Sequence, residues 1–176
     1  MELIERAKRV RLVGFDVDGI LTDGRLYYAA TTSETKAFHV LDGMGLQLLA
    51  KAGIEVCVIS ARSSAAAARR LAELGIRRSL LGVESKRPAF ERLLRELRLD
   101  YAQAAFMGDD LPDLAILSRV GLAATVNTAF PAIQARCHWC ATRQPGSGAA
   151  REFIEFLLES QGSLERVVAP YLEAGT

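Results

Sequence analysis

Short apolar runs alternate with amphipathic segments along most of this chain. The runs have the length of buried strands, and they cover residues 11–18, 55–61, 78–81, 104–109 and 121–126. In the amphipathic segments, apolar residues recur every three or four positions, as on one face of a helix, at residues 43–52, 63–74, 88–99 and 149–158. The alternation predicts an α/β protein with a three-layer, Rossmann-like fold, in which helices pack on a parallel sheet.

Local signals mark where some of these helices begin and end. Ser63 and Ser64 can cap the start of an alanine-rich helix, and Gly75 stands where a C-terminal glycine would end it. Pro112 fits the first turn of a short helix that runs to Leu117.

The segment directly after the first strand departs from this alternation. Two short runs of β-forming residues, 25–30 and 35–40, flank the polar residues 31–34. They predict a β-hairpin that is inserted after strand 1. Because 176 residues are enough for one full core and too few for two ordinary domains, we expect a single domain over residues 1–176.

Composition and charge exclude several classes of protein. The 22 basic and 21 acidic residues leave a net charge of +1, so no field of the whole molecule attracts nucleic acid or an anionic membrane. The apolar runs are too short to cross a bilayer, and residues 1–9 lack the apolar core of a secretion signal. We expect a soluble cytoplasmic protein that binds neither nucleic acid nor membrane.

The cysteines give little sign of a metal or redox function. Their number is odd, and Cys57 falls in an apolar run, so a disulfide framework is not expected. Cys137 and Cys140 have the spacing of half a zinc site, but no second pair of Cys or His residues completes four ligands. Buried thiols are the favoured interpretation.

Polar residues gather at the carboxyl ends of the predicted strands, where open parallel sheets bind ligands. Asp16 and Asp18 end the first strand, and Gly19 lets the backbone turn tightly after them. At the ends of the later strands, or directly after them at the same edge, stand Ser60, Arg62, Lys86, Asp109, Asp110 and Asp113.

This set of residues matches the requirements of phosphoryl transfer. Asp16 can attack phosphorus, and Asp18 can donate a proton to the leaving oxygen and later accept one from water. Asp16 and Asp109 can bind Mg²⁺, which prefers carboxylate and phosphate oxygens. The phosphate would be held by Ser60, Arg62 and Lys86, while Asp110 and Asp113 would support the metal waters or the lysine.

In these residues the sequence resembles the haloacid dehalogenase superfamily. Its four motifs are matched, in order, by residues 16–22 (Asp-Val-Asp-Gly-Ile-Leu-Thr), Ser60, Lys86 and residues 108–113 (Gly-Asp-Asp-Leu-Pro-Asp). Within the superfamily, the chain is similar to the family of 3-deoxy-D-manno-octulosonate 8-phosphate phosphatases from about residue 11 to about residue 158. This narrower similarity is carried by residues 16–28, 36–40, 42–43, 53–56 and 146–152.

The resemblance implies a Mg²⁺-dependent phosphatase without a cap domain, which forms homotetramers and acts in lipopolysaccharide biosynthesis. It implies that Asp16 is both nucleophile and metal ligand, and that Asp109 completes the metal site. Asp18 would be the acid/base and would bind the metal through its backbone carbonyl. The resemblance also implies that a glycine-rich tail reaches a neighbouring subunit's pocket, where Gly146, Gly148 and Arg151 would contact the substrate.

Three alternatives to this function remain open at the level of sequence. The substrate could be the phosphate ester of a nine-carbon keto-sugar acid instead of an eight-carbon one. A phospho-accepting receiver domain has similar groups, but its acidic pair lies on the first strand and its acceptor on a later strand. A non-catalytic assembly protein on the same fold is disfavoured, because every expected chemical group is present.

Overall fold

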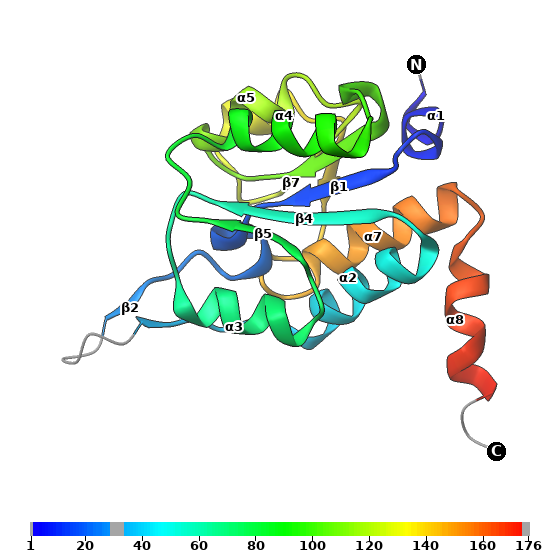
Figure 1. The fold of residues 1–176 in the computed structure, drawn as a ribbon, viewed down its shortest axis with the longest axis horizontal. Helices are drawn as coiled ribbons and strands as arrows, with labels where there is room; N and C mark the ends of the chain where they lie inside the picture. The colour runs from blue at the N-terminus through cyan, green and yellow to red at the C-terminus, as the bar shows by residue number, and fades with distance from the viewer. Residues whose placement is uncertain (1, 29–33, 174–176) are drawn as a thin grey trace.

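The computed structural model describes residues 2–28 and 34–173, and it is built around one six-stranded sheet (Figure 1). All neighbouring strands are parallel, and their order is β5-β4-β1-β6-β7-β8. The strands are β1 (Leu12–Phe15), β4 (Glu55–Ser60), β5 (Arg78–Leu81), β6 (Ala104–Met107), β7 (Leu122–Val126) and β8 (Trp139–Ala141).

Helices cover both faces of the sheet, which confirms the three-layer α/β fold (Figure 1). On one face lie α4 (Lys86–Leu97) and α5 (Leu114–Leu117), and on the other lie α2 (Val40–Ala52), α3 (Ala65–Glu73) and α7 (Ala149–Ser160). The remaining α-helices of the described residues are α1 (Leu3–Lys8), α6 (Pro131–Gln134) and α8 (Leu164–Glu173). In the residues that the structure describes, no helix is long and apolar enough to cross a membrane.

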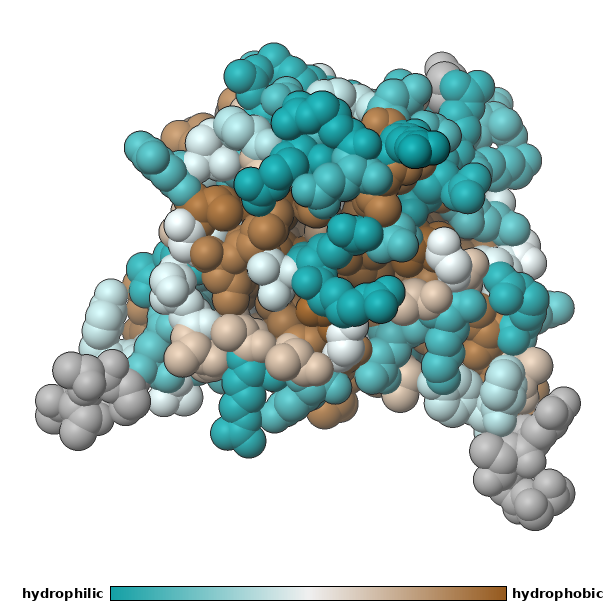
Figure 2. Space-filling view, viewed as in Figure 1, coloured by the Kyte–Doolittle hydropathy of each residue, from teal (hydrophilic) through white to brown (hydrophobic). Residues whose placement is uncertain are grey.

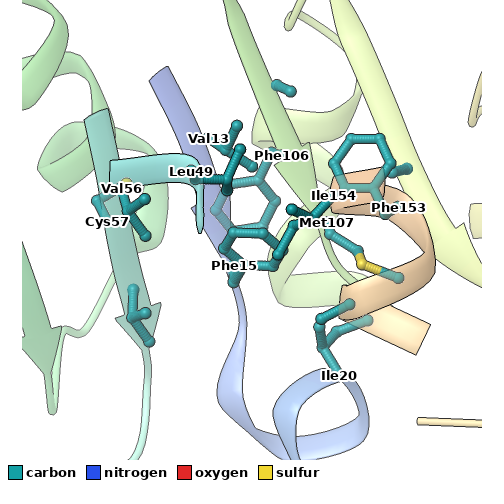
Figure 3. Close-up of a cluster of buried hydrophobic side chains, with 14 of the residues drawn as sticks. Val13, Phe15, Ile20, Leu49, Val56, Cys57, Phe106, Met107, Phe153 and Ile154 are labelled. Carbon is teal, nitrogen blue, oxygen red and sulfur yellow. The ribbon is translucent and has the colours of Figure 1, made fainter. Parts of the chain in front are cut away.

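The core lies between the sheet and its two helical layers (Figure 3). The strand β1 is buried along its whole length because it is central and covered on both faces, which explains its unbroken apolar run. The ring of Phe15 meets that of Phe153 on α7 edge to face at 6.5 Å. On the other face, Phe106 meets Phe90 on α4 in the same way at 5.7 Å. Figure 2 shows apolar surface between the helices of this view, over the sheet edge where Figure 1 draws β5.

Two helices begin earlier than the sequence pattern predicts. The helix α2 begins at Val40 instead of Gly43, because His39 caps it: His39 Nδ1 accepts a hydrogen bond from the backbone N–H of Leu41 at 3.2 Å. The helix α4 begins at Lys86, so Pro88 lies in its first turn, where a missing N–H leaves no hydrogen bond unmade. The predicted cap of α3 is confirmed, since Ser64 Oγ accepts from the N–H of Ala67 at 3.3 Å.

The predicted hairpin is confirmed as the two short antiparallel strands β2 (Tyr27–Tyr28) and β3 (Glu34–Thr35). It leaves the body of the molecule at the carboxyl edge of the sheet (Figure 1). Residues 29–33, which are the end of the first predicted run and most of the polar turn, lie outside the described residues. The described part of the chain between β1 and α2 contains no cap domain.

The sixth strand was absent from the sequence pattern. The strand β8 contains only three residues, and Trp139 in it packs against Phe153 at 5.0 Å and Phe156 at 5.9 Å between ring centroids. His138 is tied to the neighbouring strand, because its Nδ1 accepts from the N–H of Ala123 at 2.9 Å. The Cys137 to Cys140 segment is therefore a sheet edge, and all three cysteines of the chain are free thiols.

Candidate active site

A cavity of about 300 Å³ opens at the carboxyl edge of the sheet. The segments after β1, β4, β5 and β6 all contribute to it, as expected for an open parallel sheet. The cavity is lined by Asp16, Asp18, Gly24, Ser60, Ala61, Arg62, Lys86, Asp109, Asp110, Pro112 and Asp113. The structure thus brings together every predicted site residue outside the glycine-rich segment 146–151.

The backbone after β1 is shaped to present Asp16 and Asp18 to this cavity. The N–H of Asp16 still belongs to the sheet, because it donates to Met107 O on β6 at 3.0 Å. The chain then turns tightly over Val17–Leu21, and Gly19 has a φ of +89°. A Cβ at Gly19 would lie 2.0 Å from Asp109 Oδ2, so only glycine permits both the turn and the approach of that carboxylate.

Lys86 joins Asp16 to a second buried acid, Asp113. Its Nζ lies 2.7 Å from Asp16 Oδ1 and 2.6 Å from Asp113 Oδ1. Burial works against its charge, but the carboxylates of Asp113 and Asp16 outweigh burial and raise the pKa of Lys86 above its ordinary value. Asp113 is fixed in turn, since its Oδ2 accepts from the backbone N–H groups of Asp109 and Asp110 at 3.2 and 3.4 Å. Lys86 is therefore a fixed positive charge beside Asp16.

The acids of the cavity have the properties of a cation site. Carboxylate oxygens of Asp16, Asp109 and Asp113 lie within 4.8 Å of one another. Asp109 Oδ1 is buried without a hydrogen-bond partner among the described residues, a costly state that a metal ion would relieve. Burial, together with the neighbouring acids, raises the pKa of Asp16 and that of Asp109 to about 7. All-oxygen donors of this kind fit Mg²⁺.

Within this cluster, the sequence selects Asp16 and Asp109 as metal ligands, and that role stays a prediction. For Asp113 the sequence analysis predicts a supporting role, in which it holds the metal waters or the lysine. Its carboxylate contacts Lys86 and two backbone N–H groups, which is compatible with that role. The carboxylate of Asp18 is outside the cluster. Metal binding through the Asp18 carbonyl stays a prediction. Asp110 is exposed and caps the next turn, because its Oδ1 accepts from the N–H of Leu111 at 2.8 Å.

Ser60 and Arg62 present donors from the end of β4. The hydroxyl of buried Ser60 accepts the N–H of Arg62 at 3.2 Å, which leaves its own O–H directed to other acceptors. The Arg62 side chain is 45% exposed, and its Nε lies 3.7 Å from Asp18 Oδ2. A hydroxyl and a guanidinium group at the same rim suit an oxyanion ligand.

Lys36 and Glu34 are functional candidates that the sequence reasoning missed. Lys36 forms an ion pair with Asp18 Oδ1, and its Nζ lies 3.3 Å from Glu34 Oε1. Both residues come from the hairpin segment, to which the sequence analysis assigned no catalytic residue. The only signal in the sequence was the position of Lys36 in the segment 36–40, which carried part of the family resemblance.

The glycine-rich segment lies beside this cavity without lining it. The N–H of Gly146 donates to Ile20 O at 3.0 Å, and the N–H groups of Gly148 and Arg151 donate to the Asp42 carboxylate at 3.2 and 2.9 Å. The Arg151 side chain pairs with Glu155 at 2.7 Å. A second hollow of about 390 Å³ is lined by Asp23, Arg25, Thr128, Gln144, Pro145 and Ser147. Contact between segment 146–151 and a neighbouring subunit's substrate stays a prediction.

Comparison with known proteins adds an independent observation. A family model described as haloacid dehalogenase-like hydrolase matches residues 41–121. The chain is 37% identical over 164 residues to the 3-deoxy-D-manno-octulosonate 8-phosphate phosphatase KdsC of Escherichia coli K12, and the match covers 93% of this chain and 87% of that protein.

Two solved structures have nearly the same fold. A hypothetical protein from Xanthomonas campestris superposes with a TM-score of 0.92 at 48% identity, covering 96% of this chain and 92% of that one. The 3-deoxy-D-manno-octulosonate 8-phosphate phosphatase of Moraxella catarrhalis was solved in complex with magnesium, phosphate and KDO. It superposes with a TM-score of 0.93 at 37% identity, covering 96% of this chain and 97% of that one.

Proposed function

Because the chain belongs to the 3-deoxy-D-manno-octulosonate 8-phosphate phosphatase family of haloacid dehalogenase-like hydrolases, we propose that it hydrolyses this ester to the free sugar acid and phosphate. The observation that carries the proposal is the shared cavity of Asp16, Asp18, Lys86 and Asp109, in a chain that matches KdsC over 93% of its length. Membership of this family excludes the receiver-domain alternative. The reaction would supply the inner-core sugar of lipopolysaccharide.

In the first chemical step, the Asp16 carboxylate attacks phosphorus and an acyl phosphate forms. The bond between phosphorus and the sugar oxygen breaks, and Asp18 donates its proton to that oxygen. Lys86 holds Asp16 in place from 2.7 Å and adds positive charge beside the incoming phosphate. Ser60 and Arg62 donate hydrogen bonds to phosphate oxygens at the rim.

In the second step, water attacks the phosphorus of the acyl phosphate, and Asp18 takes the proton of that water. The bond between phosphorus and Asp16 breaks, so phosphate leaves and the carboxylate is restored. A bound Mg²⁺, held by Asp16 and Asp109, would offset the negative charge that the carboxylates and the phosphate bring together. Asp113 keeps Lys86 in position during both steps.

The proposed substrate is tested by a panel of sugar phosphates. We expect kcat/KM for 3-deoxy-D-manno-octulosonate 8-phosphate to exceed that for nine-carbon 2-keto-sugar acid phosphates by at least about tenfold, a difference of about 1.4 kcal/mol in transition-state binding. A clear preference for a nine-carbon ester would replace the substrate assignment and leave the phosphatase mechanism intact. The absence of Mg²⁺-dependent release from every ester would contradict the mechanism itself.

We also propose a cytoplasmic homotetramer in which the hairpins meet. Large apolar side chains are exposed at the hairpin and just after it: Leu26, Tyr27, Tyr28, Val40 and Leu41. Exposed apolar side chains that gather in this way mark a site of contact with another protein chain. Light scattering should give about four times the chain mass, and Tyr28→Glu should lower it. The same exchange at Tyr171, which is exposed on α8, serves as the control. A wild-type monomer would contradict this assembly.

A further inference from the structure

Four charged side chains form a closed ring of alternating sign beside the cavity. Lys36 pairs with Asp18 Oδ1 and lies 3.3 Å from Glu34 Oε1. Arg62 Nη2 lies 3.1 Å from the same Glu34 oxygen, and Arg62 Nε lies 3.7 Å from Asp18 Oδ2. The ring joins three segments that are distant in the sequence: the turn after β1, the hairpin, and the loop after β4.

The two bases of the ring differ sharply in exposure. The Lys36 side chain is 1% exposed, whereas that of Arg62 is 45% exposed. A buried ammonium group between two carboxylates is held in one place, because its departure would leave charges buried and unpaired. Arg62 can turn towards an anion in the cavity while Lys36 keeps its position. Lys36 itself does not line the cavity, so it reaches the reaction only through Asp18.

We propose that Lys36 is a positioning residue for the acid/base Asp18, and that the hairpin thereby serves ester cleavage within its own subunit. This inference rests on the proposed phosphatase mechanism. Lys36 holds Asp18 Oδ1, which fixes the rotation of the carboxyl group. The other oxygen, Asp18 Oδ2, is buried, has no hydrogen-bond partner among the described residues, and belongs to a side chain that lines the cavity. It is the oxygen that can exchange a proton with the leaving group.

Two aryl esters of nearly equal shape test this role. Phenolate is a poor leaving group that needs a proton, whereas p-nitrophenolate departs without one. Lys36→Gln should therefore lower kcat/KM for phenyl phosphate by about 10- to 100-fold, as a misplaced general acid does, and that for p-nitrophenyl phosphate by less than about threefold. Since kcat/KM covers only the steps up to departure of the leaving group, later hydrolysis does not affect the comparison.

Matched variants separate this role from a general effect of mutation. Lys8→Gln makes the same exchange in an exposed ion pair with Glu5, and it should leave kcat/KM unchanged for both esters. Glu34→Gln retains Lys36 but removes the charge of its second partner. It should therefore also lower kcat/KM more for phenyl phosphate than for p-nitrophenyl phosphate, but by a smaller factor than Lys36→Gln. If Lys36→Gln does not fold, as judged by circular dichroism, Glu34→Gln carries the test. Equal losses on both esters, or a change in KM alone, would overturn the proposal.

A double variant tests whether Lys36 acts through Asp18. In the Asp18→Asn background, Lys36→Gln should cause no further loss on phenyl phosphate, because the group that it positions has already been removed. A further loss of tenfold would mean that Lys36 acts independently of Asp18 and would overturn the assignment. Wild-type protein inactive on both esters would instead refute the proposed function, which keeps the two failures distinguishable.

Discussion

Asp16 and Asp18 are two positions apart in the first loop, and their different surroundings suit the separate tasks proposed for them. Asp16 is buried against Lys86, which favours attack by its carboxylate, whereas Asp18 lies between Lys36 and the cavity. Asp16→Asn should abolish turnover and preserve the fold, because the amide has nearly the same shape. Activity assays measure the turnover, and circular dichroism shows whether the fold is preserved. Near-normal turnover would contradict the role of nucleophile.

Asp18→Asn should instead slow hydrolysis of the acyl phosphate, since the attacking water loses its base. Incubation with p-nitrophenyl phosphate, which forms the intermediate without an acid, should then leave phosphate attached to the protein. Intact-mass spectrometry at low pH would detect the added phosphoryl group. Asp16→Asn treated in the same way is the control and should remain unmodified.

The raised pKa values of Asp16 and Asp109 predict how metal and pH act together. Both acids have an ordinary pKa of 3.8 and a folded value of about 7, so between these values the folded protein holds more protons than the unfolded chain. The stability of the metal-free protein therefore falls as pH rises from about 4 to about 7. Mg²⁺ competes with the same protons, so we expect tighter binding at pH 8 than at pH 6.

Thermal unfolding with Mg²⁺ or with EDTA measures this linkage. At pH 8, Mg²⁺ at about 100 times its Kd should raise Tm by roughly 5–10 °C, and the rise should be smaller at pH 6. Asp109→Asn should lose most of the rise at both pH values. Equal rises at pH 6 and pH 8 in the wild type would show that protons and metal do not share these two carboxylates.

At the scale of elements, a side chain of α2 accepts hydrogen bonds from the backbone at the start of α7. Asp42, in the first turn of α2, is buried and accepts N–H groups of Gly148 and Arg151 at the start of α7. Asp42→Ala should destabilise the protein by about 1–2 kcal/mol, because the start of α7 loses its acceptors. Urea unfolding gives the value. Asp42→Asn keeps one carbonyl oxygen and should cost less, whereas equal costs would contradict the capping role.

The elements differ in how far their sequences predict them. The strand β5 has the predicted bounds, Arg78–Leu81, because an apolar run between turn signals is a local pattern. The start of α2 was misplaced, since the cap formed by His39 lies before the amphipathic pattern begins. The strand β8 was missed because three residues are too short for a period to appear, and its partners in β7 and α7 lie elsewhere in the sequence.

At the scale of the whole molecule, the single domain expected over residues 1–176 remains a proposal with a direct test. Trp139, the only tryptophan of the chain, lies on the edge strand β8, so its fluorescence reports on one end of the sheet. Circular dichroism reports on helices throughout the protein. Both signals should change at the same urea concentration if the chain unfolds as one cooperative unit. Two separate midpoints would indicate independently unfolding parts.

The sequence by itself determined the alternation of five of the six sheet strands with the main covering helices, and it selected the polar set at the strand ends, because both depend on local periods and on the shared carboxyl edge of parallel strands. Asp16, Asp18, Ser60, Lys86 and Asp109 could be selected for this reason. Only the tertiary structure decided which charges meet. Lys36 reaches Asp18 from 18 residues away, and Gly148 reaches Asp42 from 106 residues away. Such pairs depend on how distant segments pack against each other, and the local hydrophobic periodicity of the sequence contains no information about that packing.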